Sequence, residues 1–210
     1  MKILISAFDA FNNQQINPTQ QIIENLPQKI DSVLIESILL PTVRYQSIKK
    51  LQDKIIETNP DFILMLGQAS GLKGFHIERV AINIDDFRIK DNEGNQPIDE
   101  KISNHGKEAY FSTLPIKAIT RNLANKGYIA NISNSAGTFV CNHLFYGCAQ
   151  FLDEKNMNIP FGFVHVCDLD ANNSHNLSYS LKEMMDATIT IIQTIVNADK
   201  DLSISGGLEY

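Results

Sequence analysis

Short apolar runs rich in β-branched residues alternate along the chain with longer segments whose apolar residues recur at helical spacing. The short runs predict strands at residues 2–6, 31–40, 62–66, 79–84, 128–133 and 161–166. The longer segments predict helices at residues 17–26, 44–57, 115–125, 142–153 and 177–196. This alternation is typical of an α/β fold in which helices cover a sheet.

Local signals mark several of these boundaries. Asn17 followed by Pro18 predicts a helix start, with Asn as the N-cap and Pro at the first helical position. Pro27 ends that helix, and Pro41 ends the second strand. Residues 85–104 form a polar, turn-rich segment that is long enough to be a functional loop rather than a simple connection.

No internal repeat, low-complexity tract or Pro/Gly/Ser-rich linker divides the chain, so we expect a single domain over residues 1–210. Strand-type runs flanked by helices predict a mostly parallel or mixed central sheet that is covered on both faces. In such sheets, ligands bind beyond the carboxyl ends of the strands. Functional side chains are therefore expected at those ends.

Composition and charge exclude several classes of function. The apolar fraction of 43% and the charged fraction of 20% are those of a globular protein. The net charge of -6, with no basic run beyond Lys49-Lys50, argues against a nucleic-acid partner. No apolar stretch approaches the roughly 20 residues that span a membrane. The apolar run before Asp9 is too short for a signal peptide, so we expect no membrane partner and a cytoplasmic location.

Three cysteines, Cys141, Cys148 and Cys167, fit a reducing compartment. An odd number cannot complete a disulfide framework, and no Cys-x-x-Cys pair indicates zinc or redox exchange. The ordinary expectation for each is a small buried apolar residue. Cys148 lies two helical turns after Cys141 and is expected in the core, whereas Cys167 follows a predicted strand and has no helix start behind it.

Cys141 lies where a glycine-containing loop, residues 134–139, passes into a predicted helix. The unpaired N–H groups in the first turn of a helix carry partial positive charge, which favours a thiolate over a thiol. The same N–H groups can stabilise the oxyanion that forms when a thiolate attacks a carbonyl. Cys141 is therefore the candidate nucleophile.

His165 lies near the end of an apolar run, at the carboxyl end of a predicted strand. A single histidine there is more often structural than catalytic, but together with a helix-start cysteine it is a candidate general base. The competing bases are the remaining histidines, His76, His105, His143 and His175. His143 is two residues after Cys141, and residues at that spacing on a helix do not face each other, so it is the weaker choice.

Glu78 is the candidate third member of the site. It precedes the predicted strand at residues 79–84 and follows a glycine-containing loop. A carboxylate that accepts a hydrogen bond from the far imidazole nitrogen orients the ring and favours its protonated form. A solvated surface glutamate is the alternative. Arg88 and Asp91, in the polar segment that follows, either belong to the site or form a surface ion pair.

Four blocks of sequence, spread over most of the chain, carry a specific resemblance. They are residues 67–69 (Gly-Gln-Ala) with 78–83 (Glu-Arg-Val-Ala-Ile-Asn), residues 91–98 (Asp-Asn-Glu-Gly-Asn-Gln-Pro-Ile), residues 134–147 with the core Gly-Thr-Phe-Val-Cys-Asn-His, and residues 163–166 (Phe-Val-His-Val). In this order and with this spacing, the blocks resemble the pyroglutamyl peptidase I family of cysteine peptidases, also called pyrrolidone-carboxylate peptidases.

The resemblance implies hydrolysis of the amide bond after an N-terminal pyroglutamyl (5-oxoprolyl) residue, through a thioester on Cys141. It implies His165 as the base and later the acid, Glu78 as the orienting carboxylate, and Arg88 as a contributor to the electrostatics of the site. It also implies that other residues line or shape the substrate pocket, namely Phe8, Phe11, Asn17, Ile89, Phe139 and Val140.

The same resemblance implies a three-layer α/β/α sandwich that needs no metal or cofactor. Its expected partners are N-terminally pyroglutamylated peptides and further copies of the chain, in a homo-oligomer that is a dimer or a tetramer. A pyroglutamyl ring is small, flat and uncharged, so two aromatic faces and a few hydrogen-bonding groups suffice to hold it, which suits Phe8 and Phe11 on one loop.

The chain departs from the family pattern at three places. Ala10 stands where the family has a proline, and Asn12 and Asn13 stand where it has glycines; asparagine tolerates positive φ less readily than glycine. Leu72 replaces a common arginine, and Cys167-Asp168 replaces a proline-led turn. None of these departures touches the proposed triad, and all bear on the geometry of the pocket.

Two other functions remain open from the sequence. One is a cysteine amidase or peptidase that accepts a different small N-terminal group, because the loop around Ala10 is altered. The other is a binding protein that has kept the pocket and lost turnover. The presence of Cys141, His165 and Glu78 together argues against the second, because drift after loss of catalysis has no reason to spare all three.

Overall fold

The computed structural model describes residues 1–12, 14–169 and 178–207. Its strands are β1 (Lys2–Phe8), β2 (Lys29–Ile30), β3 (Val33–Leu40), β4 (Phe62–Gln68), β5 (Phe75–Glu78), β6 (Val80–Ile82), β7 (Ala109–Phe111), β8 (Ala130–Ser133) and β9 (Phe161–Val166). Its helices are α1 (Pro18–Asn25), α2 (Gln46–Thr58), α3 (Ile116–Asn125), α4 (Val140–Glu154) and α5 (Leu181–Asn197).

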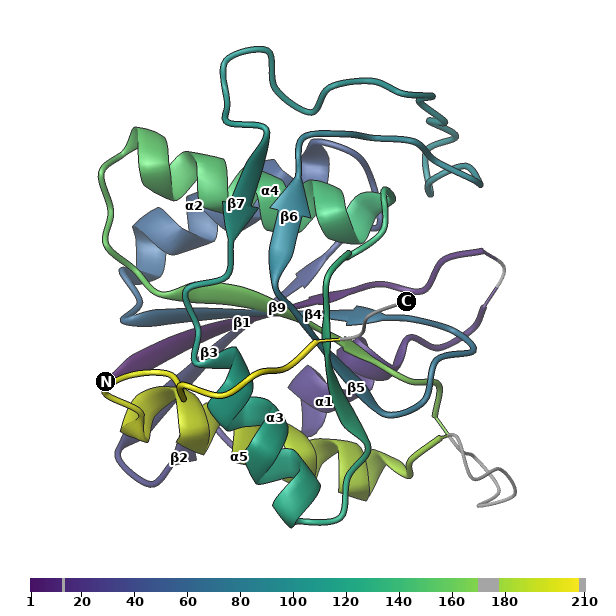
Figure 1. Ribbon diagram of the computed structural model, residues 1–210. Coiled ribbons are helices and arrows are strands. Elements are labelled where there is room, and N and C mark those ends of the chain that lie inside the picture. The colour runs from purple at the N-terminus through teal and green to yellow at the C-terminus, as the bar shows by residue number, and fades with distance from the viewer. Residues whose placement is uncertain (13, 170–177, 208–210) are drawn as a thin grey trace.

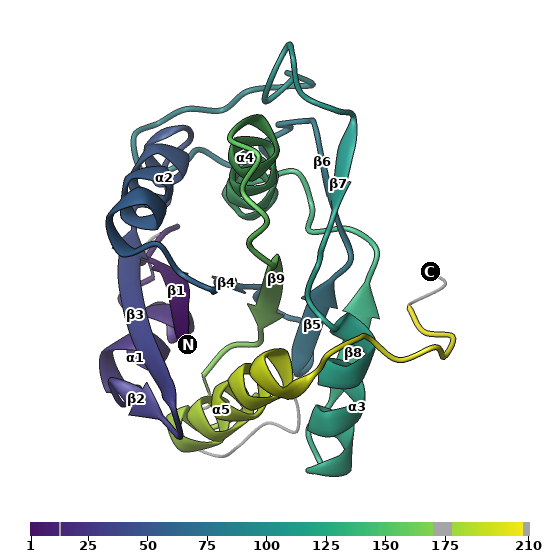
Figure 2. The same cartoon turned by 90° about the vertical axis from the view of Figure 1, so that its left-hand side faces the viewer.

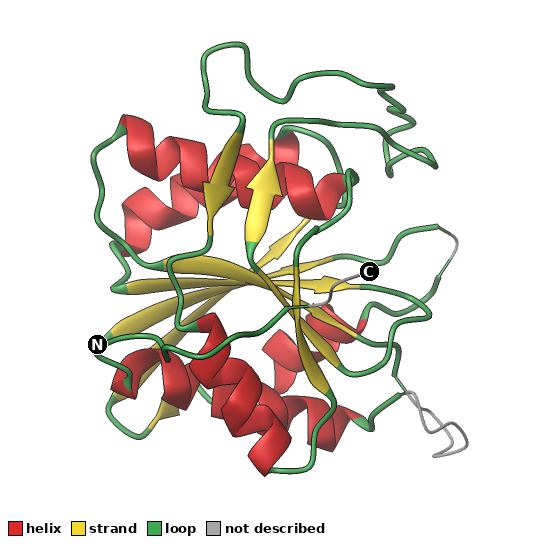
Figure 3. Ribbon diagram, in the orientation of Figure 1, coloured by secondary structure: helices red, strands yellow, loops and turns green. Residues whose placement is uncertain are grey.

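A seven-stranded mixed sheet forms the middle of the molecule, in the order β2-β3-β1-β4-β9-β5-β8 (Figures 1 and 3). The four strands from β3 to β9 run parallel, so β1, β4 and β9 end at the same edge. β5 runs antiparallel to β9, and β8 follows the direction of β5. This arrangement confirms the predicted α/β fold with a mixed sheet.

Helices cover both faces of this sheet, as seen with the sheet turned on edge (Figure 2). On one face α1, α3 and α5 bury a core that includes Ile22, Leu123 and Ile191. On the other face α2 and α4 bury a second core that includes Leu51 and Phe145. The three layers of the predicted sandwich are thereby present, and each core buries one face of the sheet.

The helix starts follow from local chemistry. The Asn17 side chain accepts a hydrogen bond from the backbone N–H of Thr19 at 3.0 Å, with Pro18 at the first helical position, as the sequence predicts. α5 begins with a capping box between Ser180 and Glu183. The predicted helix at 177–196 therefore begins at Leu181 in the structure, and residue 177 lies outside the described residues.

The strand predicted over residues 79–84 is present as β6, but it spans only Val80–Ile82. Glu78 precedes it as predicted, but as the last residue of a separate strand, β5, which lies in the central sheet between β9 and β8. After Arg79 the chain leaves this sheet, and Val80–Ile82 pairs with Ala109–Phe111 in a separate two-stranded ribbon beside α4 (Figure 1). The polar segment between β6 and β7 extends from this ribbon at the top of Figure 1.

No helix in the described part of the chain is long and apolar enough to cross a membrane.

Candidate active site

Cys141 is the second residue of α4, which begins at Val140 after the N-cap Phe139. No side chain caps this helix start among the described residues, so the N–H groups of the first turn are not engaged by a capping oxygen. The chain enters the helix through a turn at Gly137, whose φ of 76° favours glycine. The predicted position of Cys141 at a loop-to-helix junction is confirmed.

Gly67, near the carboxyl end of β4, lies directly against the Cys141 sulfur. A Cβ at Gly67 would stand 2.9 Å from Cys141 Sγ and 2.6 Å from Cζ of Phe163. Gly67 pairs with His165 of the parallel strand β9, so it lies on the same face of the sheet as the imidazole. The missing side chain of Gly67 therefore makes the space in which the thiol and the imidazole meet.

His165 and Glu78 form a buried hydrogen-bonded pair. His165 Nδ1 and Glu78 Oε1 are 2.7 Å apart, and the two residues are 7% and 1% exposed. They come from the antiparallel neighbours β9 and β5, and both point to the face of the sheet that α4 covers. The structure thus brings together Cys141, His165 and Glu78, which are far apart in sequence.

The charge on His165 depends on these two neighbours. Burial of the imidazole lowers the pKa of His165. The charge of Cys141, the hydrogen bond between Cys141 and His165, and the Glu78 carboxylate act in the opposite direction. Together they outweigh burial and raise the pKa of His165 to about 10. An imidazolium is therefore the stable form of His165 at neutral pH when its sulfur neighbour is a thiolate. This arrangement is the one that an activated cysteine needs.

The competing histidines lie elsewhere or are engaged. His143 is fully buried, and its ring contacts Asp85 rather than Cys141. His105 is exposed in the segment between β6 and β7. His76 lies opposite His165 across the β5–β9 pair, where burial lowers its pKa despite the hydrogen bond to the Lys73 carbonyl. His175 lies outside the described residues.

A cavity of about 330 Å³ opens next to the thiol. Its lining combines aromatic side chains with Cys141, His165, Glu78 and residues of the nearby loops. The full lining is Phe8, Phe11, Asn17, Thr42, Gln68, Ala69, Leu72, Glu78, Ser133, Ser135, Ala136, Gly137, Phe139, Cys141 and His165. The ring centroids of Phe11 and Phe139 are 6.0 Å apart. The lining of the cavity is therefore largely apolar, and it includes Cys141, His165 and Glu78.

Three residues expected in the pocket lie outside this lining. Val140 is fully buried in the core beneath α4, because the first helical turn directs its side chain toward the sheet. Arg88 and Ile89 line a neighbouring cavity of about 440 Å³ that shares Phe11 and Phe139 with the first. Arg88 is exposed, and no ion pair joins it to Asp91 among the residues described.

The loop after β1 is braced by hydrogen bonds where the family pattern has a proline. Asp9 Oδ1 accepts from the Thr42 N–H at 2.7 Å and from Asn92 Nδ2 at 3.1 Å, and Asn92 Nδ2 also donates to the Ala10 carbonyl. Asn17 Nδ2 donates to the Asp9 carbonyl at 2.9 Å. These bonds, which single-sequence patterns do not reveal, hold the loop that carries Phe11. Phe8 was expected on the same loop, but it is the last residue of β1.

Asp168 orients a cavity-lining glutamine. Gln68 Nε2 donates to Asp168 Oδ1 at 2.7 Å, and Asp168 Oδ2 accepts from the Gly71 N–H at 3.1 Å. A carboxylate only accepts hydrogen bonds, so it fixes the amide nitrogen of Gln68 on its own side. Gln68 Oε1 is consequently left buried with no hydrogen-bond partner in the described residues. Gln68 thus brings an acceptor in a fixed orientation to the cavity lining, and Glu78 Oε2 is a second buried acceptor there without a hydrogen-bond partner in the described residues.

The other two cysteines are separated from the thiol of Cys141. Cys148 is buried in α4, where burial raises the pKa of its thiol, and the prediction of a core residue is confirmed. Cys167 is buried in the core on the opposite face of the sheet, and burial also raises the pKa of its thiol. No group of three or more His, Cys, Asp or Glu side chains in the described ranges is arranged to hold a metal ion.

Substituting Gly67 with alanine is expected to reduce kcat about 100-fold, because the new methyl group displaces the sulfur of Cys141 from its place beside His165. The matched control is Gly162→Ala in the adjacent strand, where the added Cβ meets Ser112 and Leu114 instead. Both variants should lose stability through overpacking. Equal kcat values in the two variants would show that the space at Gly67 has no bearing on the thiol.

Comparison with known proteins gives a consistent result. Residues 1–198 match the sequence profile of the family described as pyroglutamyl peptidase. A pyrrolidone-carboxylate peptidase of Fusobacterium nucleatum subsp. nucleatum is 46% identical over 209 residues, which cover 98% of each chain. One from Finegoldia magna is 44% identical over 210 residues, with 99% of each chain covered.

Solved structures agree in fold over nearly the whole length. The pyroglutamyl peptidase I of Bacillus amyloliquefaciens superimposes with a TM-score of 0.91 at 36% identity, covering 97% of this chain and 99% of that one. The pyrrolidone carboxyl peptidase of Thermococcus litoralis gives a TM-score of 0.91 at 31% identity, with 97% and 99% coverage.

Proposed function

The chain belongs to the pyroglutamyl peptidase family, a family of exopeptidases, and from this membership we propose that it removes an N-terminal pyroglutamyl residue from peptides by cysteine catalysis. The observation that carries the proposal is the meeting of Cys141 with the buried His165–Glu78 pair in the lining of a largely apolar cavity. Peptides with a pyroglutamyl N-terminus are the proposed substrates.

The first half of the reaction forms a thioester. The Cys141 thiolate attacks the carbonyl carbon that follows the pyroglutamyl ring, and a C–S bond forms as the carbonyl oxygen becomes an oxyanion. The His165 imidazolium then gives its proton to the leaving nitrogen, and the C–N bond breaks. The shortened peptide departs with a free amine, and the pyroglutamyl group stays on the sulfur.

The second half releases the acid. The imidazole of His165, now neutral, takes a proton from water as the oxygen attacks the thioester carbonyl, and the C–S bond breaks. Pyroglutamate departs, and the thiolate and the imidazolium are restored. Glu78 accepts the Nδ1–H of His165 in both halves, so it holds the ring with Nε2 toward the reacting atoms. No metal or cofactor takes part in this cycle.

The start of α4 is the proposed oxyanion site. Its first-turn N–H groups are not engaged by a side-chain cap, and Cys141 is the second residue of the helix. These groups can therefore donate hydrogen bonds to the oxyanion that forms when the sulfur attacks. The partial positive charge of the helix N-terminus acts in the same direction. Arg88, in the neighbouring cavity, adds positive charge on the approach to the site.

The cavity suits a small, uncharged lactam. Phe8, Phe11 and Phe139 supply apolar surface for the flat ring. The free Oε1 of Gln68 can accept a hydrogen bond from the lactam N–H. An N-terminal prolyl residue has a charged secondary amine in place of this neutral N–H. Leu72 adds an apolar wall where the family commonly has arginine. Ile89 and Val140 support this pocket from outside its lining.

The test is product analysis on a matched pair of peptides. We expect the protein to shorten a peptide with an N-terminal pyroglutamyl residue by that residue alone, and to leave the same sequence with an N-terminal prolyl or alanyl residue intact. Mass spectrometry reports each product. Cleavage of the prolyl peptide instead would favour the alternative of a different small acyl group. Tight binding of the pyroglutamyl peptide without any cleavage would favour the binding protein.

Substituting Glu78 with glutamine is expected to lower kcat about 100-fold, less than loss of the nucleophile, because Glu78 orients a reacting group and does not itself react. Glu78 raises the pKa of His165. Its neutralisation therefore lowers that pKa, and the imidazolium is lost at a lower pH. The alkaline limb of the kcat/KM profile should consequently move to lower pH. An unchanged profile would show that Glu78 does not act on His165.

A further inference from the structure

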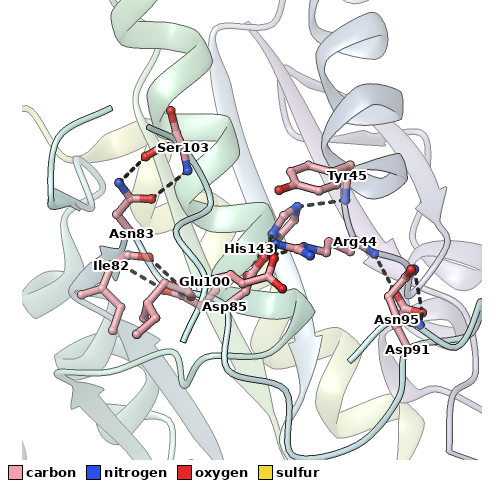
Figure 4. A network of polar contacts seen from close by, with 12 residues as sticks. Arg44, Tyr45, Ile82, Asn83, Asp85, Asp91, Asn95, Glu100, Ser103 and His143 are labelled. Atoms are coloured by element: carbon pink, nitrogen blue, oxygen red, sulfur yellow. Dashed lines mark hydrogen bonds and ion pairs between the residues drawn. The ribbon is translucent and has the colours of Figure 1, made fainter. Parts of the chain in front are cut away.

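A second buried carboxylate–imidazole pair joins the first turn of α4 to the segment after β6 (Figure 4). His143 Nδ1 is 2.8 and 3.0 Å from the two carboxylate oxygens of Asp85, and both side chains are fully buried. His143 Nε2 is 2.9 Å from the backbone nitrogen of Tyr45. The mechanism proposed above does not use this pair, although His143 is only two residues from Cys141.

The hydrogen bonds fix the tautomer of His143. The backbone N–H of Tyr45 can only donate, so Nε2 of His143 accepts and carries no hydrogen. The imidazole proton is therefore on Nδ1 and is donated to Asp85. Like the Glu78–His165 pair, this pair joins a carboxylate to an imidazole Nδ1. The Nε2 of His143, however, faces the backbone N–H of Tyr45 rather than a thiol.

Asp85 is itself anchored from two sides. Arg44 Nε donates to Asp85 Oδ2 at 2.9 Å, and the same guanidinium contacts the Glu100 carboxylate at 2.7 Å. The backbone N–H of Asp85 donates to the Glu100 carbonyl at 2.7 Å. The negative charge of the buried carboxylate is thus compensated, and His143 is held by a group that cannot move freely.

The segment that carries Asp85 also holds the residues on either side of Cys141. Asn142 Oδ1 accepts from the Ile82 N–H at 3.0 Å, and Asn142 Nδ2 donates to the Ile82 carbonyl at 2.9 Å. Before the nucleophile, Thr138 Oγ1 donates to the Asp86 carbonyl at 2.7 Å. Residues 82–86 therefore clamp the chain at both ends of the turn that presents the sulfur.

Tyr45 extends the same network to α2. Its φ of 59° is unusual for a residue with a bulky side chain, and such a conformation persists only where the surroundings hold it. The Tyr45 ring packs edge-on against His143 with ring centroids 4.8 Å apart. His143 therefore joins the start of α2, the segment 82–86 and the start of α4 at one point.

We infer that Asp85 and His143 are a positioning pair, which sets the first turn of α4 and thereby the place of the Cys141 sulfur relative to His165. The inference rests on the proposed function only in taking Cys141 as the nucleophile. Loss of the imidazole leaves a buried carboxylate oxygen and the Tyr45 N–H without their partner, which loosens the turn. The pair acts through Cys141 and does not touch the substrate.

The test compares two variants of His143. His143→Ala is expected to lower kcat on pyroglutamyl-aminomethylcoumarin about 10- to 100-fold with KM changed less than about twofold, and to slow alkylation of Cys141 by iodoacetamide to a similar degree. His143→Gln should restore most of both rates, because its amide nitrogen can donate to Asp85 and its amide oxygen can accept from Tyr45. Mass spectrometry assigns the alkylation to Cys141.

The alkylation rate separates this inference from the proposed function, because iodoacetamide reacts with the thiol whatever acyl group the enzyme accepts. The control is Leu123→Ala in the core on the other face of the sheet, which should lower the melting temperature and leave both rates unchanged. If His143→Ala does not fold, His143→Leu fills the same space without either hydrogen bond and should show the same losses. Folded His143 variants with wild-type kcat and wild-type alkylation would overturn the inference, as would a glutamine variant no better than alanine.

Discussion

Replacing Cys141 with alanine is expected to reduce turnover of pyroglutamyl-aminomethylcoumarin to background, a loss of at least about four orders of magnitude. No other thiol can take over, because Cys148 and Cys167 are buried, the first deeper in α4 and the second on the far face of the sheet. The alanine leaves the fold intact, since Cys141 is only partly buried and makes no structural bond to a second thiol.

The matched control for this substitution is Cys148→Ala, which removes a sulfur from the same helix two turns away. It should keep the wild-type kcat, because its side chain contacts core residues and not the cavity. Fluorophore release measured in reductant gives both values. Activity of Cys141→Ala close to that of the wild type would end the proposed mechanism.

Replacing His165 with alanine is expected to lower kcat about 1,000-fold or more, because the same imidazole stabilises the thiolate, protonates the leaving nitrogen and later activates water. Its high pKa depends on direct contact with Cys141 and Glu78, which alanine cannot replace. Free imidazole added to the buffer should restore part of the lost rate by entering the vacated space.

His76→Gln serves as the control for His165, because His76 lies directly opposite on the same face of the sheet. It should lose less than about tenfold in kcat, since burial lowers the pKa of His76 and its side chain does not line the cavity. Imidazole should have no effect on that variant. A His76 variant as impaired as His165→Ala would reassign the general base.

Sequence patterns were sufficient to predict the layers of the fold and to select Cys141 and His165, which the structure brings together. The helix at 142–153 and the strand at 161–166 follow from periodicity. Cys141 lies at the start of that helix, and His165 lies near the carboxyl end of that strand. The contact of Glu78 with the imidazole was predicted, but its position in the central sheet was not. β5 is short and mixes polar with apolar residues, so its pairing with β9 is set by tertiary contacts.

The residues that position the reactive groups carry little sequence signal of their own. Gly67 matters because of what a side chain would strike, which only the packed structure reveals. Asp85 and His143 are distant in sequence, and no periodic pattern predicts that they contact each other. The same holds for Asp168, which accepts a hydrogen bond from the amide of Gln68 although the two are 100 residues apart in the sequence. Long-range hydrogen bonds of this kind are invisible to local patterns.

The altered loop after β1 shows how a departure from the family pattern is accommodated. Asn12 adopts a φ of 52°, a conformation that asparagine tolerates better than most residues. Asp9, Thr42 and Asn92 supply the rigidity that a proline at Ala10 would otherwise give. Phe8 at the end of β1 and Phe11 on the loop both line the cavity, so the cavity keeps these two aromatic side chains without the proline.

Titration of activity against alkylation of Cys141 tests whether this thiol is the nucleophile. The protein is treated with increasing amounts of iodoacetamide, the fraction of Cys141 modified is determined by mass spectrometry, and release of fluorophore from pyroglutamyl-aminomethylcoumarin is measured on the same samples. We predict that the residual rate equals the unmodified fraction of Cys141 at every point and reaches zero when modification is complete. Full activity with Cys141 completely alkylated would show that the reaction does not use this thiol.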